Sequence, residues 1–525
     1  MSSIPKPVVL IVLDGWGISN TTQGNPIREA KLPFFEQLNR NYPLTTLQAS
    51  GVSVGLPWNT EGNSEVGHMT LGAGQVIYQN LPRITLSMQS EEFFANPAFL
   101  EATNKVKATG GALHLMGLLS EGSVHSHRDH LYALLKLAKD QGIEKLFVHV
   151  FTDGRDSSPT AGATMIQDLN NRMRNEGIGK LASLGGRNFG MDRNNNWDRV
   201  QKAYQILTEG GPNQTADPQE YIKESYHKEV TDEYIEPVAV TENGKPIGII
   251  QDGDAIIFFN FREDRAREIT KAFTLPKFDS FPRSKKLDLV FVTMTEYEQN
   301  LPVLVAFPPA QIKDTLGEIL SHAGKTQLRI AETEKYAHVT YFFNGGNEKA
   351  WEGEERILIP SPFTTHFDEV PEMSTPKITD KVLELLPENK YDFILINYAN
   401  PDMVAHTGNE KATIEAVESV DKTLSILLPK ILEAGGAIFI TADHGNAEEL
   451  KKIASGEIDT EHSNNPVPLW FISPDNQRQK TAQQMMEEQN TVQGLLSDVA
   501  PTILDLMGIP KPEAMRGDSL LSFLN

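Results

Sequence analysis

The chain of 525 residues contains no cysteine. This absence excludes a disulfide framework, a thiolate nucleophile, and zinc or iron–sulfur sites that are held by thiolates. Any metal ion must therefore be bound by histidine, aspartate, glutamate or hydroxyl groups. Such a mixed set of oxygen and nitrogen ligands favours manganese, magnesium or zinc.

Positive charge and long apolar runs are also scarce. Lys and Arg number 48 against 70 Asp and Glu, which gives a formal net charge of −22. A charge this negative argues against the binding of nucleic acid or of an anionic membrane. The chain has no apolar stretch near the ~18 residues of a transmembrane helix, and the apolar run Val8–Leu13 is too short for a signal peptide. We therefore expect a cytoplasmic protein.

Short apolar runs that end in polar residues recur along the chain. Such runs are typical of strands buried on both faces of a parallel sheet. Helical patterns lie between them, such as Arg128–Gln141 and Thr413–Ala434, and this alternation predicts an α/β fold. At about 150 residues per domain, the length predicts two to four domains. The predicted strands lie in the segments Val8–Gly15, Ala112–Gly122, Lys145–Asp156, Ala255–Arg265, Phe393–Asp402 and Ala437–Asn446.

The polar residues that follow these runs are candidates for a functional site, because ligands of open α/β sheets bind at the carboxyl ends of the strands. A single acidic residue in such a position is more often a helix cap or a turn former. Because this pattern recurs in every predicted strand, we favour a functional site over a set of isolated caps and turns. These positions hold Asp14, Ser120, Asp153, Asp156, Arg262, Asp402 and Asp443.

Two segments are candidate linkers between domains. In 302–311, three prolines interrupt a short apolar segment just before a predicted helix. A second possible hinge lies at 74–82. We see no internal repeat and no low-complexity segment.

Several segments carry candidate metal ligands. Asp402 and His406 are four residues apart, so on a helical turn they share one face. Asp443 and His444 are adjacent where a strand gives way to a loop, and His462 lies in a loop near prolines. Each pair alone is more often a capped loop than a metal site. Together with Asp14, they provide enough ligands for two divalent ions, and two-metal sites typically act on phosphoryl groups.

A hydroxyl nucleophile is available in the glycine-rich segment Asn59–Gly74. Ser64 precedes a predicted helix there, so the helix N-terminus could stabilise a bound phosphate. A serine hydroxyl needs activation before it attacks, and a metal ion could supply it. From this loop alone, a simple turn with a capping serine is the more frequent interpretation.

The middle of the chain carries arginines in predicted loops at strand ends. The planar guanidinium binds carboxylates and phosphates through two hydrogen bonds. A single arginine is usually part of a surface ion pair, but several at strand ends of an acidic protein indicate a small polyanion such as a phosphorylated carboxylic acid. The candidates are Arg155, Arg187, Arg193, Arg262 and Arg265, with His125 and His127 nearby in the sequence VHSHRDH.

At this point the motifs match a known family. The chain closely resembles the cofactor-independent phosphoglycerate mutases and, more distantly, the alkaline phosphatase superfamily. The resemblance extends from about Val8 to Leu521. It rests on LDGWG, GNSEVGH, VHSH, DGRD, MDR, FNFR, MTEYE, AETEKYAHVTYFFNGG, NYANPDMVAHTG, TADHGNAE and NPVP, which follow one another along the chain.

The resemblance implies two α/β domains. A discontinuous, alkaline-phosphatase-like metal domain would comprise residues 1–76 and 311–525, and an inserted substrate-binding phosphotransferase domain would comprise 77–310. The segregation of motifs agrees with this arrangement, since Asp14 and Ser64 must meet Asp402 and Asp443. The arginine-rich block between them is then an insertion.

The resemblance also implies two manganese ions, for which magnesium or cobalt could substitute. One ion would be bound by Asp402, His406 and His462, and the other by Asp14, Ser64, Asp443 and His444. Ser64 would accept the phosphoryl group, and Lys335 would stabilise its charge. Arg262 and Arg265 would bind the phosphate. The glycerate would be held by His125, Arg155, Asp156, Arg187 and Arg193, with Asp156 near its hydroxyl groups as a catalytic residue.

The leading hypothesis is therefore the interconversion of 3-phosphoglycerate and 2-phosphoglycerate in glycolysis and gluconeogenesis, through a phosphoserine and without 2,3-bisphosphoglycerate. We expect an enzyme that acts as a monomer on this small molecule, with no nucleic-acid or membrane partner. A metal-dependent phosphomonoesterase is the alternative, although simple hydrolysis does not need the large arginine-bearing insert. A non-catalytic binding protein is a third class, against which the complete ligand set argues.

Overall fold

The computed structural model describes residues 4–452 and 455–524. The chain divides into two units. The first unit comprises the residues up to Gln79 and those from Ala310 onward, and the inserted unit comprises Asn80–Pro309. The predicted boundaries, at 76/77 and 310/311, lie close to these positions.

The first unit is built on an eight-stranded sheet in the order β13-β12-β14-β1-β15-β16-β2-β17. Its central strand, β1, is completely buried and runs parallel to both of its neighbours, β14 and β15. The strands are β1 (Val8–Leu13), β2 (Leu44–Gln48), β12 (Gln327–Glu332), β13 (Glu354–Ile359), β14 (Phe393–Tyr398), β15 (Ala437–Thr441), β16 (Val467–Ile472) and β17 (Val492–Leu495).

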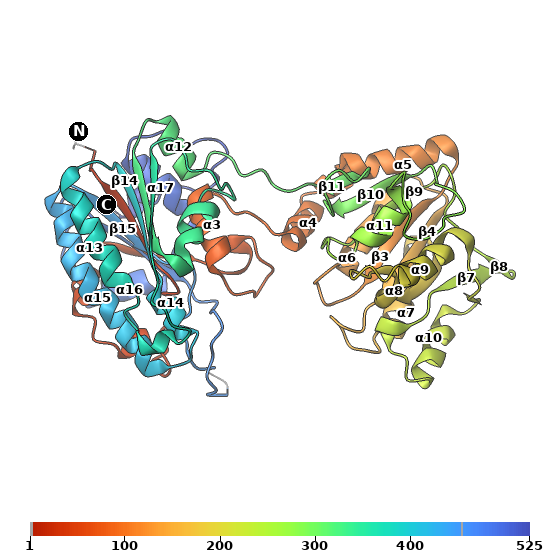
Figure 1. Ribbon diagram of the computed structural model, residues 1–525, viewed down its shortest axis with the longest axis horizontal. Coiled ribbons are helices and arrows are strands. Elements are labelled where there is room, and N and C mark those ends of the chain that lie inside the picture. Colours follow the sequence, from red (N-terminus) through yellow and green to blue (C-terminus); the bar gives the residue numbers. More distant parts are fainter. Residues whose placement is uncertain (1–3, 453–454, 525) are drawn as a thin grey trace. The chain divides into compact units, whose positions relative to one another are not determined.

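Helices cover both faces of this sheet. In Figure 1, α13 and α15 lie on one side of the sheet and α3 lies on the other. The helices of the unit are α1 (Pro26–Glu29), α2 (Pro33–Asn41), α3 (Ser64–Ala73), α12 (Leu316–His322), α13 (Thr375–Leu385), α14 (Asn400–Ala405), α15 (Glu410–Glu433), α16 (Ala482–Asn490), α17 (Val499–Leu506) and α18 (Leu521–Leu524).

The predicted strands β1, β14 and β15 are parallel, as expected, but the sheet also contains β16, which was not predicted and runs antiparallel to both β15 and β2. The reason lies in the loop between β15 and β16. The chain leaves β15 at the carboxyl edge of the parallel strands and re-enters the sheet from that same edge, which requires an antiparallel strand. Asp443 and His444, which follow β15, and His462, which precedes β16, are thereby kept at one edge of the sheet.

The inserted unit has a second mixed sheet, in the order β11-β10-β9-β3-β4-β5-β7-β6, with β8 paired to β7. Here β7 is antiparallel to β5, and the strands from β11 to β5 are parallel. The strands are β3 (Leu113–Leu119), β4 (Leu146–Thr152), β5 (Lys180–Gly186), β6 (Gln214–Thr215), β7 (Val238–Glu242), β8 (Lys245–Pro246), β9 (Ala255–Phe258), β10 (Val290–Thr295) and β11 (Leu304–Phe307).

The strands of the inserted unit are apolar on both faces because each face packs against its own core. Within β3, Leu113 and Leu115 belong to one hydrophobic cluster, whereas Met116 and Leu118 belong to another. The helices of the unit are α4 (Asn80–Gln89), α5 (Pro97–Thr109), α6 (Arg128–Asp140), α7 (Gly162–Glu176), α8 (Arg187–Gly190), α9 (Trp197–Glu209), α10 (Pro218–His227) and α11 (Arg267–Thr274).

The predicted helical patterns at 128–141 and 413–434 correspond to α6 and α15. Within the described residues, no helix combines the length and the apolar character that crossing a bilayer requires.

His130 on α6 offers a test of the core of the inserted unit. Its ring is fully buried, lies 3.2 Å from the Thr85 hydroxyl and packs edge-on against Phe261. Burial, with a smaller contribution from His127, lowers the pKa of His130 to about 3. In the unfolded chain a histidine titrates near pH ~6.5. Between these values the unfolded state takes up a proton that the folded state does not, so stability is lost as the pH falls.

We predict that the free energy of unfolding of the wild type declines faster than that of His130→Gln below pH ~6.5, by up to about 1.4 kcal/mol per pH unit. Urea denaturation between pH 7 and 4.5 (roughly the window set by the two pKa values) measures the difference. His227→Gln, at an exposed position of the same unit, is the control and should keep the wild-type dependence. If the free energy of unfolding changes with pH at the same rate in the wild type and in His130→Gln, the prediction is contradicted.

Candidate active site

The parallel register of three central strands creates the first cluster of functional side chains. Leu13 of β1 pairs with Tyr398 of β14, and Val12 pairs with Thr441 of β15, so the three strands end at the same level. Asp14 follows β1 directly, Asp443 follows β15 after one alanine, and Asp402 lies in the first turn of α14, so all three lie at this edge. All three carboxylates are buried.

Ser64 lies among these groups. It is the first residue of α3, which is capped by the side chain of Asn63, and it is buried rather than exposed in a turn. Its Oγ lies 3.1 Å from Asp14 Oδ1, 2.9 Å from His444 Nε2 and 2.8 Å from Lys335 Nζ. The hydroxyl therefore lies beside a carboxylate, an imidazole and an ammonium group at a helix N-terminus.

Lys335 connects the two halves of the cluster. It ends a short 3₁₀ turn (Thr333–Lys335) that follows β12, and its Nζ donates to Asp14 Oδ1 at 2.6 Å and to Asp402 Oδ2 at 2.7 Å. Burial opposes its charge, but Asp14 and Asp402 hold the pKa of Lys335 above its ordinary value. Conversely, burial raises the pKa of Asp14, but Lys335 and His444 more than offset this and hold it well below the ordinary value.

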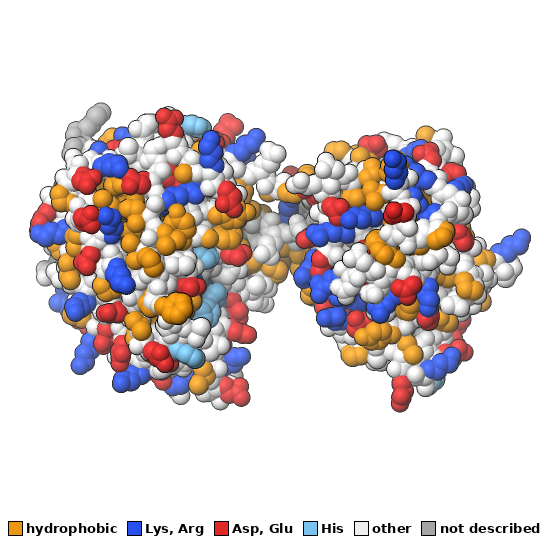
Figure 2. Space-filling view, in the orientation of Figure 1, with side chains coloured by type: hydrophobic (Ala, Val, Ile, Leu, Met, Phe, Trp, Pro, Cys, Tyr) orange, Lys and Arg blue, Asp and Glu red, His pale blue; other side chains and the backbone are white. Residues whose placement is uncertain are grey.

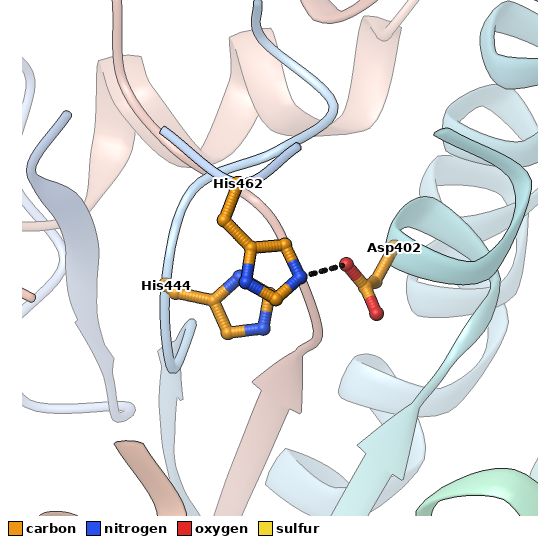
Figure 3. Close-up of side chains that lie close together, drawn as sticks. All are labelled: Asp402, His444 and His462. Carbon is orange, nitrogen blue, oxygen red and sulfur yellow. Dashed lines mark ion pairs between the residues drawn. The ribbon is translucent and has the colours of Figure 1, made fainter. Parts of the chain in front are cut away.

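The second half of the cluster contains Asp402, His406 and His462. Asp402 Oδ1 lies 3.3 Å from His406 Nε2 and 3.4 Å from His462 Nε2, and the two Nε2 atoms are 3.0 Å apart. His444 stacks on His462, with 3.9 Å between ring centroids, and also lies near Asp402 (Figure 3). The space-filling view shows histidine side chains reaching the surface of this unit beside acidic ones (Figure 2).

Each of the three histidines donates its Nδ1 proton to a backbone carbonyl. His406 bonds to Thr460 O at 2.8 Å, His462 to Gly62 O at 2.8 Å, and His444 to Gly445 O at 3.2 Å. These bonds fix the ring orientations and direct every Nε2 into the cluster. Metal-binding histidines are typically oriented in this way.

The donor chemistry fits divalent cations. Two overlapping groups of ligand atoms each lie within 4.8 Å of one another, Asp402 with His444 and His462, and Asp14 with Asp443 and His444. Within the described residues, no group donates a hydrogen bond to the buried Asp443 Oδ2. Burial lowers the pKa of His444, but Asp443 and Asp14 raise it to about 9, so the acidic surroundings favour a cation at this position. All seven predicted metal ligands are thus brought together.

Three residues that sequence reasoning missed support these ligands. Asn397 donates to Asp14 Oδ2 at 2.7 Å, and Asn446 donates to Asp402 Oδ1 at 2.7 Å. His68 Nδ1 lies 2.9 Å from Ser64 O and 3.1 Å from Asp443 Oδ2. The only sequence signal for them was their position inside motifs chosen for other residues.

The second cluster lies in the inserted unit, at the carboxyl ends of β4, β5 and β9. Arg187, almost completely buried, donates to Asp153 Oδ1 at 2.7 Å and also to Asp156. Ser120, at the end of β3, donates to the second oxygen of Asp153. This network fixes the DGRD loop and directs the Arg187 guanidinium toward Asp156.

Asp264, which sequence reasoning also missed, joins three of the predicted binding residues. Its oxygens lie 2.8 Å from Arg193 Nη1, 3.3 Å from Arg262 Nε and 3.5 Å from His125 Nδ1. On its other side, His125 Nε2 lies 3.9 Å from Asp156. Burial and Arg187 lower the pKa of His125 to about 4, so its ring is neutral near pH 7.

The remaining two arginines border the same network. Arg265 donates to Met191 O at 3.2 Å, and burial together with Arg187, Arg193 and Arg155 lowers the pKa of its guanidinium. Arg155 is half exposed and lies 3.6 Å from Glu233. The seven predicted substrate-binding residues of the inserted unit therefore form one cationic cluster.

Arg187 should be important for stability as well as for binding. Removing one partner of a buried ion pair leaves an uncompensated buried charge and costs about 3–5 kcal/mol. We predict that Arg187→Ala lowers the free energy of unfolding of the inserted unit by that amount, as measured by urea denaturation. Arg174→Ala, at an exposed position on α7, is the control. If Arg187→Ala and Arg174→Ala have the same midpoint of urea denaturation, the prediction is contradicted.

Comparison with known proteins identifies relatives of this chain. A family model described as the BPG-independent PGAM N-terminus matches residues 84–299, and one described as type I phosphodiesterase / nucleotide pyrophosphatase matches residues 278–495. The chain is 46% identical over 520 residues to the 2,3-bisphosphoglycerate-independent phosphoglycerate mutase of Moorella thermoacetica, covering 99% of each chain. It is 48% identical over 515 residues to the enzyme of the same name from a Synechococcus species, covering 98% of this chain and 96% of the other.

Among solved structures, the chain is similar to a phosphoglycerate mutase of Leishmania mexicana determined at low cobalt concentration. The two share 30% sequence identity with a TM-score of 0.51, over 98% of this chain and 97% of the other. The predicted two-domain α/β class with an alkaline-phosphatase-like domain is confirmed, and so is the assignment as an isomerase. The chain belongs to the family of 2,3-bisphosphoglycerate-independent phosphoglycerate mutases.

Proposed function

We propose that this enzyme interconverts 3-phosphoglycerate and 2-phosphoglycerate in glycolysis and gluconeogenesis through a phosphoserine at Ser64. The observation that carries the proposal is the environment of the Ser64 hydroxyl. It lies within 3.1 Å of Asp14, His444 and Lys335, among the predicted metal ligands. This arrangement supports activation of the hydroxyl and stabilisation of negative charge next to it.

Asp402, His406 and His462 would hold one manganese ion, and Asp14, Ser64, Asp443 and His444 the other. Bound divalent ions lower the pKa of a coordinated hydroxyl and neutralise phosphoryl charge. Magnesium or cobalt can take the same ligands, and the similar enzyme of Leishmania mexicana was crystallised at low cobalt concentration.

Two features of the protein itself favour a phosphoryl group on Ser64. The residue begins a ten-residue helix, where free backbone N–H groups and the helix dipole attract phosphate. Lys335 Nζ lies 2.8 Å from the Ser64 oxygen and carries a positive charge that the two neighbouring carboxylates maintain. Lys335 would therefore stabilise charge on the transferring group.

The cationic cluster of the inserted unit would bind the same substrate. Arg262 and Arg265 would bind its phosphate, and His125, Arg155, Arg187 and Arg193 its glycerate. Asp156 lies between His125 and Arg187, where its carboxylate could accept and return the proton of a glycerate hydroxyl. The excess of guanidinium groups over carboxylates matches a substrate that has both a phosphate and a carboxylate.

The reaction would proceed in two balanced halves. In the first half, the bond between phosphorus and the O3 atom of glycerate breaks as a bond between phosphorus and Ser64 Oγ forms. In the second half, the phosphoserine bond breaks as phosphorus bonds to the O2 atom of glycerate. One proton moves between the hydroxyl groups, and neither water nor 2,3-bisphosphoglycerate is consumed.

We also propose that the enzyme acts as a monomer in the cytoplasm, without a nucleic-acid or membrane partner. Each cluster draws all of its residues from a single unit of one chain, which supports activity without a second subunit. The net charge of −22 supports the absence of polyanionic partners.

A direct assay tests this function. Purified protein should convert 3-phosphoglycerate to 2-phosphoglycerate without added 2,3-bisphosphoglycerate and without releasing phosphate. A chelator should abolish the conversion, and manganese should restore it, because the ligand set depends on a bound cation. Release of phosphate without isomerisation would instead identify the phosphomonoesterase alternative, and full activity after chelation would refute the metal dependence.

The nucleophile can be tested separately. Ser64→Ala should lower the mutase rate by about 10³-fold or more, because the variant lacks the hydroxyl that would form the covalent intermediate. Thermal denaturation should show that the variant is folded. Ser50→Ala removes another buried serine of the same unit and should retain activity. Substantial isomerisation by folded Ser64→Ala would exclude the phosphoserine mechanism.

A further inference from the structure

Glu448 is a buried carboxylate that the proposed reaction does not use. Only 1% of its surface is exposed. Within the residues that the structure describes, no lysine, arginine or histidine forms an ion pair with it. A buried carboxylate without such a partner must be compensated by hydrogen bonds.

Four hydrogen bonds supply this compensation, two to each oxygen. Oε2 accepts from the backbone N–H groups of Gly17 and Asn446, both at 2.9 Å. Oε1 accepts from the Ser463 hydroxyl and from Asn465 Nδ2, the latter at 2.9 Å. Every acceptor position of the carboxylate is used, and none of the four donors is a predicted metal ligand.

The donors come from three short segments of two loops, one after β1 and one between β15 and β16, and each segment carries a predicted ligand close to the donor. Gly17 is three residues after Asp14, Asn446 is two residues after His444, and Ser463 directly follows His462. Through these hydrogen bonds, Glu448 links the chain segments that carry ligands of both proposed metal sites.

Further hydrogen bonds connect the Glu448 network to Asp402, in the second half of the metal cluster. The side chain of Asn446, whose backbone bonds to Glu448, donates to Asp402 Oδ1 at 2.7 Å. Backbone hydrogen bonds from Ser463 to Gly445 and from Ala447 to Gly15 join the same loops. Displacing the Glu448 carboxylate would therefore disturb ligands of both proposed ions.

Two glycines of these loops leave just enough room for the Glu448 carboxylate. A Cβ atom on Gly17 would lie 2.2 Å from Glu448 Cδ, and one on Gly445 would lie 2.5 Å from Glu448 Oε1. Both contacts are shorter than side chains can tolerate. This explains the second glycine of LDGWG and the glycine of DHGN, which the proposed chemistry leaves unexplained.

We propose that Glu448 is a positioning residue, which holds the loops of Asp14, His444 and His462 in register and thereby sets the affinity of the enzyme for its divalent ions. This inference rests on the metal dependence proposed above. It assigns Glu448 no contact with substrate or with the reacting atoms.

Glu448→Gln is the most selective variant, because it preserves size while replacing one acceptor oxygen with a donor NH₂ group. If the NH₂ group faces Gly17 and Asn446, two N–H groups lose their acceptor. If it faces the other way, Asn465 loses its acceptor. At least one donor is unsatisfied in either orientation.

The test measures manganese binding by metal-free protein, through the electron paramagnetic resonance signal of free Mn²⁺. Replacing groups that orient metal ligands typically costs 10–100-fold in metal affinity. We expect Glu448→Gln to weaken manganese binding by about 10-fold or more, while circular dichroism shows a folded protein. At saturating manganese, kcat should recover largely, and KM for 3-phosphoglycerate should stay near the wild-type value.

Asp498→Asn is the matched control. Asp498 is also a buried carboxylate of the first unit, and it accepts the backbone N–H groups of Leu495 and Asp518 from two separate segments. Its replacement should lower stability without changing manganese affinity. Ser463→Ala removes only one donor to Glu448 and should weaken binding severalfold, which provides a second test if Glu448→Gln does not fold.

The outcomes separate this inference from the proposed function. If the wild type binds manganese and the folded Glu448→Gln or Ser463→Ala variant binds it equally well, the positioning role is refuted and the function stands. Equal losses of manganese affinity in Asp498→Asn and Glu448→Gln would also refute the positioning role, since the effect would then be general destabilisation. If the wild type binds no divalent ion, both are refuted.

Discussion

The candidate metal site depends on the register of three buried parallel strands. Because β14, β1 and β15 are buried and paired without a register shift, the polar residues at and after their ends lie together at the carboxyl edge. Asp14 follows β1 directly, Asp443 follows β15 after Ala442, and the first turn of α14 brings Asp402 to the same level. The antiparallel return of β16 keeps His462 at this edge as well.

Gathering carboxylates in a buried site has an electrostatic cost, and the structure offsets it with cationic groups. Desolvation opposes the charged forms of Asp14 and Asp402, and the ammonium group of Lys335 compensates for both. The inserted unit has the opposite balance, since five arginines surround Asp153, Asp156 and Asp264. One cluster is therefore suited to cations, and the other to an anionic substrate.

Hydrogen bonds from outside the ligand sets give both clusters their geometry. Backbone carbonyls fix the orientation of three histidines in the first unit, and Asn397 and Asn446 restrain two carboxylates. Asp153 and Asp264 play the corresponding part for Arg187, Arg193 and Arg262 in the inserted unit. In each unit, a buried polar network rather than the ligands alone sets the direction of the functional groups.

The sequence by itself was sufficient for the α/β class, for the six central strands β1, β3, β4, β9, β14 and β15, and for the candidate groups, because these follow from apolar runs and from the residue types at their ends. Asp14, Asp402, Asp443 and the five arginines were found in this way, and the likeness of the motifs to a family supplied Lys335. Only the tertiary structure decided which groups meet. Lys335 and Asp14 are 321 positions apart, and no local pattern encodes their contact. Asp264, Asn397 and Glu448 remained unrecognised for the same physical reason. Each acts through hydrogen bonds or ion pairs that include partners distant in the sequence, so its role exists only once the chain has folded.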